Sequence, residues 1–215
     1  MEKIEVKSPL RLNEEVPDFE ATTTQGPIRL SDFKGKWVIL FSHPADFTPV
    51  CTTEFAAFAE IHEELVKRNV QLIGLSIDSV YSHIAWVRTI KDKLGVDIPF
   101  PVIADLDMKV ATLFGMIHPA ASTTAAVRCV FFIDPEMKLR AMVYYPLNVG
   151  RNMKEILRVI DALQTADKYK VALPANWTPG EKVIVPPPAT QADAEKRVRE
   201  GYECVDWFLC KKKLP

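Results

Sequence analysis

The chain has 215 residues, of which 48% are hydrophobic and 8 are glycine. This size and composition predict one globular domain with an appendage and exclude two full-sized domains. Lysine and arginine total 27 against 28 acidic residues, so the charge balance gives no reason to expect nucleic acid or an acidic membrane surface as a partner.

The N-terminal residues 1–11 alternate charged with single apolar residues, so they do not resemble a signal peptide. The longest apolar runs, such as residues 37–41 and 129–133, are far shorter than the roughly 20 residues that a membrane span needs. We therefore expect a cytoplasmic protein, whose cysteines are more often catalytic than structurally cross-linked. The cysteines are Cys51, Cys129, Cys204 and Cys210.

From residue 36 to about residue 161, short β-rich runs alternate with amphipathic segments, which is typical of an α/β fold. Strands are expected at Val38–Ser42, Val70–Ile77, Phe100–Ala104, Ala126–Ile133 and Leu139–Tyr145. Because the turn signal Asp-Pro-Glu separates the last two, they are predicted to form an antiparallel hairpin. The sheet is therefore expected to be mixed.

Apolar residues at helical spacing predict three amphipathic helices, within residues 55–66, 84–94 and 153–163. After residue 167, prolines interrupt the chain and predict an extended arm. A last helix is expected from near Thr190, which can cap it, towards Gly201. We place the domain boundary between residues 165 and 166, with residues 166–215 as a C-terminal arm for oligomerisation.

Cys51 lies where a hydrophobic strand ends and an amphipathic helix begins, the edge at which α/β sheets form ligand sites. Thr48 suits the N-cap and Pro49 the first helical position, which puts Cys51 in the first turn. There the unpaired backbone N–H groups and the helix dipole favour thiolate over thiol. An isolated cysteine near an apolar helix face is usually a buried hydrophobe, but the helix-start position favours a reactive nucleophile here.

Residues 44–51, Pro-Ala-Asp-Phe-Thr-Pro-Val-Cys, fit the peroxiredoxin pattern of Pro, three residues, Thr or Ser, two residues and a peroxidatic Cys. With His43 before it and Thr52-Thr53-Glu54 after it, the stretch resembles the one-cysteine (peroxiredoxin-6-like) subgroup. The similarity continues through residues 100–105, 128–135 and 150–152 and the Pro-rich arm. It implies a thioredoxin-like fold, with a central mixed sheet flanked by helices and a C-terminal extension, and an antioxidant enzyme that reduces hydrogen peroxide and small organic hydroperoxides.

The resemblance implies roles for four residues. Cys51 would be the peroxidatic nucleophile, Thr48 a hydrogen-bond partner of the sulfur and the peroxide, and Pro44 a shield over the site. Arg128 would complete the set, because a permanently charged guanidinium stabilises the thiolate and polarises the peroxide O–O bond. Arg128 lies in an otherwise apolar strand, where an unpaired cation would be costly, although pairing at the surface is the alternative.

Three further residues each have two interpretations. His43 either touches the site or is a structural histidine at a strand end. Glu54 either orients Arg128 or lies favourably at the positive end of the helix dipole. Arg151 is either a second, more distant arginine of the family site or the cap of a loop.

The other cysteines have different expected roles. Cys129 follows Arg128 in a strand, so the two side chains point to opposite faces and Cys129 is predicted to be buried packing. Cys204 and Cys210 lie in a segment of low regularity; such a tail pair departs from the one-cysteine subgroup but is similar to pairs in archaeal relatives. The resemblance implies that the sulfenic acid of Cys51 condenses with a tail thiol of a neighbouring subunit, Cys204 first, after which the bond passes to Cys210 and a thioredoxin-like reductant closes the cycle.

The alternatives to this reading are of three kinds. The tail cysteines could simply pack, and a zinc site is not expected because Cys-x₅-Cys lacks the usual spacing; no metal or cofactor is predicted. A thioredoxin-type disulfide oxidoreductase would need a second cysteine where Glu54 stands. A non-catalytic oligomeric scaffold or holdase chaperone is the remaining alternative. The resemblance implies a homo-oligomer, at least a dimer, and leaves open a ring built from dimers as a decamer.

Overall fold

The computed structural model describes residues 10–215. The chain divides into two compact units, whose boundary in the sequence lies between Met153 and Lys154. The expectation about a signal peptide in residues 1–11 falls almost entirely outside the described residues. The sequence placed the boundary at residues 165 and 166, near the end of helix α4 (Met153–Tyr169), nearly all of which belongs to the second unit. Within the described residues, no helix has the length and apolar character needed to cross a membrane.

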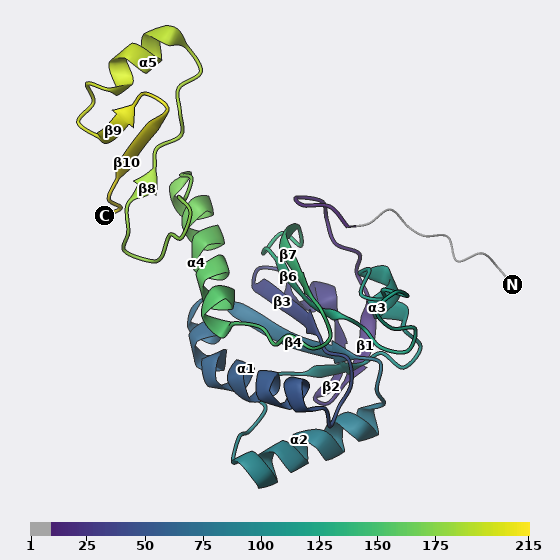
Figure 1. The fold of residues 1–215 in the computed structure, drawn as a ribbon. Coiled ribbons are helices and arrows are strands. Elements are labelled where there is room, and N and C mark those ends of the chain that lie inside the picture. The colour runs from purple at the N-terminus through teal and green to yellow at the C-terminus, as the bar shows by residue number, and fades with distance from the viewer. Residues whose placement is uncertain (1–9) are drawn as a thin grey trace, which may run out of the picture. The chain divides into compact units, whose positions relative to one another are not determined.

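The first unit is built on one mixed sheet with the strand order β2-β1-β5-β4-β3-β6-β7 (Figure 1). Strands β3, β4 and β5 run parallel, whereas β6 pairs antiparallel with β3 and forms a hairpin with β7. The mixed sheet and the final hairpin confirm the prediction, and the short strands β1 and β2 were not predicted. The strands are β1 (Glu20–Thr23), β2 (Gly26–Arg29), β3 (Trp37–Ser42), β4 (Val70–Ser76), β5 (Val102–Ala104), β6 (Arg128–Ile133) and β7 (Leu139–Tyr145).

Two long helices follow the parallel strands, α1 (Pro49–Lys67) after β3 and α2 (Val80–Leu94) after β4. Ser79 caps α2 by accepting a hydrogen bond from the backbone N–H of Ser82, and Gly95 ends it in the left-handed conformation that glycine tolerates. The short elements of this unit are η1 (Leu30–Phe33) and α3 (Lys109–Leu113). The start of α1 therefore lies at the carboxyl end of β3, where α/β sheets form their sites.

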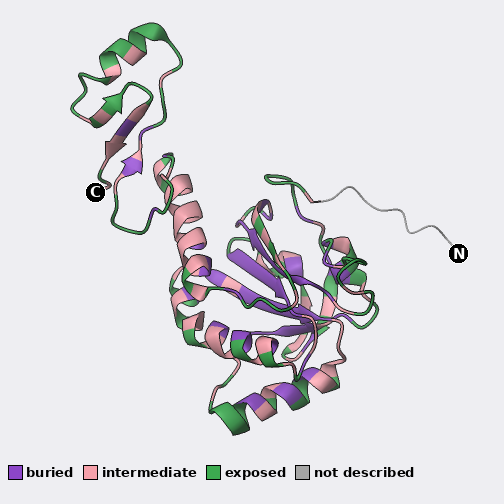
Figure 2. Ribbon diagram, in the orientation of Figure 1, coloured by how far each residue is buried: buried purple, intermediate pink, exposed green. Residues whose placement is uncertain are grey.

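The central strands are covered on both faces, as the continuous buried colour of the sheet shows in Figure 2. On one face, Leu40 belongs to a large aliphatic and aromatic cluster. On the other face, Phe41 stacks on Phe58 of α1 with ring centroids 4.2 Å apart. Gly74 permits this packing, because a Cβ atom there would lie 3.2 Å from the Phe41 ring. This close packing holds α1 against the sheet.

The second unit contains a three-stranded antiparallel sheet in the order β8-β10-β9. Its small core is formed by Val171, Trp177 and Val183. Thr190 caps α5 by accepting a hydrogen bond from the N–H of Asp193, as predicted, but the helix ends well before Gly201. The elements after α4 are β8 (Val183–Ile184), α5 (Gln191–Arg197), β9 (Glu203–Asp206) and β10 (Leu209–Lys212).

The prediction of low regularity around the tail cysteines is wrong. Cys204 in β9 lies directly opposite Cys210 in β10, and the two form a disulfide with their Cα atoms 4.0 Å apart. The strands have only four residues each, and most of the side chains of β9 are exposed, so the apolar alternation that reveals a strand in sequence is absent.

Candidate active site

Cys51 lies in the first turn of α1, as predicted, and its side chain is fully buried. Thr48 occupies the N-cap position and Pro49 the first helical position. The Thr48 hydroxyl forms no capping hydrogen bond but donates to the carbonyl oxygen of Ala45 at 2.9 Å, which closes the turn before the helix. The N–H groups of the first turn are therefore left without the Thr48 side chain as a partner.

Arg128 at the start of β6 reaches the sulfur of Cys51, although the two residues are 77 positions apart in the sequence. Its Nη1 atom lies 3.3 Å from Cys51 Sγ, and its Nε atom donates to the carbonyl oxygen of Leu147 at 2.9 Å. The side chain is only 2% exposed, which excludes the alternative of a surface ion pair. Strand β6 thus places the buried guanidinium of Arg128 beside the sulfur of Cys51.

Glu54, one turn along α1 from Cys51, accepts hydrogen bonds from two buried arginines. Arg128 Nη1 and Arg151 Nη2 each lie 2.6 Å from Glu54 Oε2, and Arg151 Nε lies 2.8 Å from Oε1. The Glu54 side chain is 2% exposed. The interpretation in which Glu54 orients Arg128 therefore matches the observed contacts.

Arg151 ties the ends of two strands to the helix. Besides Glu54, its Nη1 atom donates to the carbonyl oxygens of Ser42 at 2.9 Å and Cys129 at 3.0 Å. Its guanidinium carbon also lies 5.0 Å from the centroid of the Phe41 ring. Through these hydrogen bonds Arg151 acts as a clamp between β3, β6 and α1.

The charges of Arg128, Arg151 and Glu54 do not cancel unless the sulfur of Cys51 is ionised. Two arginines contribute two positive charges and Glu54 contributes one negative charge, which leaves one positive charge uncompensated. A buried unpaired charge is costly. A thiolate at Cys51, 3.3 Å from Arg128, would make the group neutral.

The loop between β3 and α1 holds the two remaining predicted residues. Pro44 is half-buried in this loop. His43 is fully buried and contacts the carboxylate of Asp46, with Nε2 3.0 Å from Oδ1, rather than forming a hydrogen bond to Cys51. Asp46 and its second partner, His83 of α2, were missed by sequence reasoning; a buried-face position for His83 was the available signal.

Cys129 is buried on the opposite face of the sheet, as predicted. Its sulfur lies 2.9 Å from the hydroxyl oxygen of Ser42, and burial raises the pKa of the Cys129 thiol to about 12. In the second unit, Cys204 is half-buried while Cys210 is 1% exposed. The four cysteines therefore occupy three different environments.

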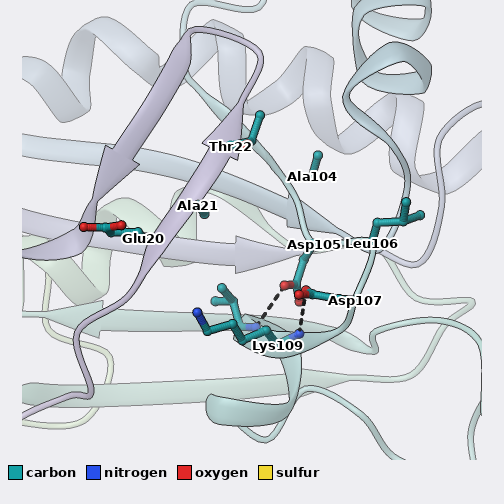
Figure 3. Close-up of a pocket in the computed structure, with 9 residues that line it drawn as sticks. Glu20, Ala21, Thr22, Ala104, Asp105, Leu106, Asp107 and Lys109 are labelled. Atoms are coloured by element: carbon teal, nitrogen blue, oxygen red, sulfur yellow. Dashed lines mark hydrogen bonds between the residues drawn. The ribbon is translucent and has the colours of Figure 1, made fainter.

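An open pocket of about 570 Å³ lies elsewhere in the first unit, between β1 and the segment joining β5 to α3 (Figure 3). Its buried carboxylate, Asp105, accepts hydrogen bonds from the backbone N–H groups of Val110 at 2.9 Å and Ala111 at 2.7 Å. Both oxygens thus hold the start of α3. None of the residues around Cys51 line this pocket, so its size does not make it the active-site candidate.

A thioredoxin-like sheet with a cysteine at the start of the helix after a parallel strand, and a buried arginine at the sulfur, defines a cysteine-dependent redox protein. The AhpC/TSA family matches residues 12–142, and the C-terminal domain of 1-Cys peroxiredoxin matches residues 162–201. A peroxiredoxin of Aquifex aeolicus is 61% identical over 98% of this chain and 100% of its own length.

Two solved structures are similar to the chain over nearly its whole length. The yeast mitochondrial 1-Cys peroxiredoxin has a TM-score of 0.85 and 44% identity, covering 95% of this chain and 100% of its own. A cysteine-to-serine mutant of peroxiredoxin 6 of Arenicola marina has a TM-score of 0.85 and 39% identity, covering 96% and 99%. The chain belongs to the peroxiredoxin family, as the motif around Cys51 predicted.

Proposed function

We propose that this chain is a thiol peroxidase that reduces hydrogen peroxide and small organic hydroperoxides, with Cys51 as the nucleophile. The observation that carries the proposal is the charge balance at the site. Arg128 and Arg151 exceed Glu54 by one positive charge, and the sulfur of Cys51 lies 3.3 Å from Arg128. The thiolate is the nucleophilic form of cysteine, so a site that favours it favours this reaction.

In the proposed reaction, the Cys51 thiolate attacks one oxygen of the hydroperoxide. An S–O bond forms as the O–O bond breaks, the sulfur is oxidised to a sulfenic acid, and the other oxygen leaves as hydroxide or alkoxide and takes up a proton. Arg128 supplies a fixed cation where negative charge moves from sulfur to oxygen. Thr48, at the N-cap of α1, would form a hydrogen bond with the peroxide. Pro44, in the loop before the helix, would shield the sulfur.

The tail cysteines support a proposal for how the sulfenic acid is resolved. The Cys204 thiol condenses with the Cys51 sulfenic acid, releasing water and forming a Cys51–Cys204 disulfide between neighbouring subunits. The Cys210 thiolate then attacks Cys204, which frees Cys51 and leaves the Cys204–Cys210 disulfide that the second unit contains. Cys204 is the more exposed of the two sulfurs, which favours it as the first partner.

A dithiol reductant of the thioredoxin type would then reduce the Cys204–Cys210 disulfide, making the chain a thioredoxin-dependent peroxidase. The yeast mitochondrial structure concerns thiol resolution via glutathione and thioredoxin systems, which supports a thiol reductant as the class. Resolution between subunits requires a homo-oligomer, so we propose at least a dimer. The cytoplasmic location stays a prediction from the sequence.

The peroxidase activity is tested by mixing the reduced full-length protein with one equivalent of hydrogen peroxide and following peroxide loss. We expect one peroxide to be consumed per chain, and the Cys51→Ser variant to consume none. Cys129→Ser is the matched control, because it removes another buried thiol and leaves the reaction unchanged. A wild-type protein that consumes no peroxide would contradict the proposal and favour the scaffold or chaperone alternative.

The resolution step has its own test. Peroxide-treated protein, separated without reductant, should contain disulfide-linked subunits, and these should accumulate in Cys210→Ser because the second exchange is blocked. Cys204→Ser should lack them. If a variant that carries both Cys204→Ser and Cys210→Ser keeps the disulfide-linked subunits and the thioredoxin-dependent turnover, the tail pair does not resolve Cys51.

A further inference from the structure

The two strands that carry the tail disulfide occupy unequal positions in the sheet of the second unit. In the order β8-β10-β9, strand β10 is central and β9 lies at an edge (Figure 1). Strand β10 pairs with β8 through Lys211 and Lys212, and the carbonyl oxygen of Cys210 accepts a hydrogen bond from the N–H of Val185 at 2.9 Å. Strand β9 pairs with β10. The pairing of β10 with β8 therefore does not depend on β9.

Burial differs between the two strands in the same direction. In β10, Cys210 is 1% exposed and its three neighbours are half-buried. In β9, Cys204 is half-buried, whereas Glu203, Val205 and Asp206 are exposed, Val205 to 78%. Burial of apolar surface is the main favourable term that holds an element in place. Strand β9 gains little from it, so it depends on its other contacts.

The noncovalent contacts of β9 are weak ones. Its residue Glu203 forms an ion pair with Lys182, but both side chains are exposed, and such pairs contribute little to stability. The pairing with β10 covers four residues and shifts register next to Cys210. Ladders this short are marginal in water without a buried face. The disulfide between Cys204 and Cys210 is therefore the strongest link between β9 and the rest of the unit.

We propose that this disulfide is a reversible latch on β9, which we call the β9 latch. A dithiol reductant donates two electrons to the Cys204–Cys210 bond, so that its own thiols become a disulfide and the tail gains two thiols. Strand β9 then separates from β10 and carries Cys204 into solvent, while Cys210 stays in the sheet. Reduction thus converts one half of the pair into a mobile thiol and leaves the other half fixed.

The latch rests on the proposed function and gives its resolution step a direction. A mobile Cys204 can reach the sulfenic acid of Cys51 in a neighbouring subunit, whereas Cys210 is held in place by β8. When the Cys210 thiolate later attacks Cys204, Cys51 is released and β9 pairs with β10 again. The order of the two cysteines therefore follows from the order of the strands in the sheet.

Hydrogen exchange of the full-length Cys51→Ser variant tests the latch, because its tail pair can be oxidised with diamide and reduced with dithiothreitol without any peroxide. Closing a loop of this length with a disulfide changes an opening equilibrium on the order of 50-fold. We expect the backbone amides of residues 203–206 to exchange faster by about this factor after reduction. The amides of residues 209–212 should change by less than about threefold.

A matched variant separates loss of the bond from effects of the reductant. Cys204→Ser in the same Cys51→Ser background keeps the buried Cys210, and its residues 203–206 should exchange at the reduced rate under both conditions. Unchanged exchange of residues 203–206 on reduction would overturn the latch. Equal acceleration in residues 203–206 and 209–212 would overturn it as well, because the whole hairpin would then open together.

Alkylation of the reduced Cys51→Ser variant gives a second readout. Cys204 should react with iodoacetamide at least about tenfold faster than Cys210 in the folded protein, and the two should react alike in urea. Equal rates in the folded protein would overturn the latch. Both measurements are independent of catalysis, so a wild-type protein that consumes no peroxide would overturn the proposed function and leave these results standing.

Discussion

Cys51 and Cys129 are both fully buried in the same unit, yet their surroundings differ in one decisive feature. The sulfur of Cys51 meets the guanidinium of Arg128, whereas the sulfur of Cys129 meets the neutral hydroxyl of Ser42. For Cys129, burial raises the thiol pKa to about 12. Burial by itself disfavours ionisation of a thiol, and we propose that the buried cation beside Cys51 offsets this effect.

Strand geometry produces this difference from adjacent residues. Arg128 and Cys129 are neighbours in β6, so their side chains leave opposite faces of the sheet. Arg128 enters the space below α1, while Cys129 joins the apolar cluster that contains Phe131 and Ile133. Each of the following predictions removes one element of this contrast.

Glu54→Gln should have the largest effect. It leaves Arg128 and Arg151 buried without their shared carboxylate, which should lower the free energy of unfolding by about 3–5 kcal/mol. Urea unfolding at pH 7 measures the change. Glu64→Gln on the same helix is the control, because the Glu64 side chain is 45% exposed and its pairs with Lys67 and Arg68 should matter little. Equal stability of the two variants would show that the buried charges do not need Glu54.

Arg128→Met should abolish the distinction between the two cysteines. We expect the rate of Cys51 oxidation by peroxide to fall by on the order of 10²–10³, because the fixed positive charge at the reacting atoms is lost. Stopped-flow measurement of peroxide loss checks this. Arg140→Met, which removes an arginine paired with Asp134 on the neighbouring strand, should react like the wild type. A rate within error of wild type in Arg128→Met would break the comparison.

Cys129→Ala should make the stability of the protein less sensitive to alkaline pH. The raised pKa keeps the folded thiol protonated, while the unfolded thiol ionises near its ordinary value of 9.0, so the wild type loses stability as pH rises above 9. At pH 10 this loss should be on the order of 1 kcal/mol more than in Cys129→Ala. The urea unfolding midpoints of the wild type and of Cys129→Ala at pH 8 and pH 10 measure how the stability of each changes with pH. An equal change in both proteins would mean that Cys129 ionises normally in the folded protein.

The smallest expected effect is that of Cys129→Ala on catalysis. Because Cys129 faces away from Arg128, the variant should reduce peroxide at the wild-type rate at pH 7. A large loss would show that the two faces of the sheet are coupled, for example through the Arg151 contact with the Cys129 carbonyl oxygen.

The candidate site could be predicted where its chemistry is local in the sequence. The residues from Pro44 to Cys51 form one motif, and Arg128 could be found because a cation in an apolar strand demands a partner. The double role of Glu54 and the clamp formed by Arg151 could not be separated from their alternatives, since both depend on which loops meet in space. His83 was missed because a histidine on a helix gives no signal of the carboxylate opposite it.

The prediction of the fold also succeeded where the signal is local in the sequence. It failed where an element depends on contacts between distant segments. The buried strands β3, β4 and β6 consist mostly of consecutive apolar residues, so they could be recognised in the sequence as short apolar runs. The short strands β1 and β2 and the tail strands β9 and β10 have four residues each and mixed burial, so pairing rather than composition defines them. The Cys204–Cys210 disulfide follows from the pairing of β9 with β10, and the spacing of the two cysteines in the sequence did not predict it.

Peptide mapping by mass spectrometry after graded hydrogen peroxide tests the contrast between the two buried thiols most directly. The reduced, folded protein is exposed to increasing peroxide, unreacted thiols are blocked after unfolding, and the peptides that contain Cys51 and Cys129 are compared. Oxidation, as sulfenic acid or a disulfide with Cys204, should appear on Cys51 at the lowest dose while Cys129 remains a free thiol. Equal oxidation of both, or oxidation of Cys129 first, would contradict the claim that Arg128 and not burial sets the reactivity of these cysteines.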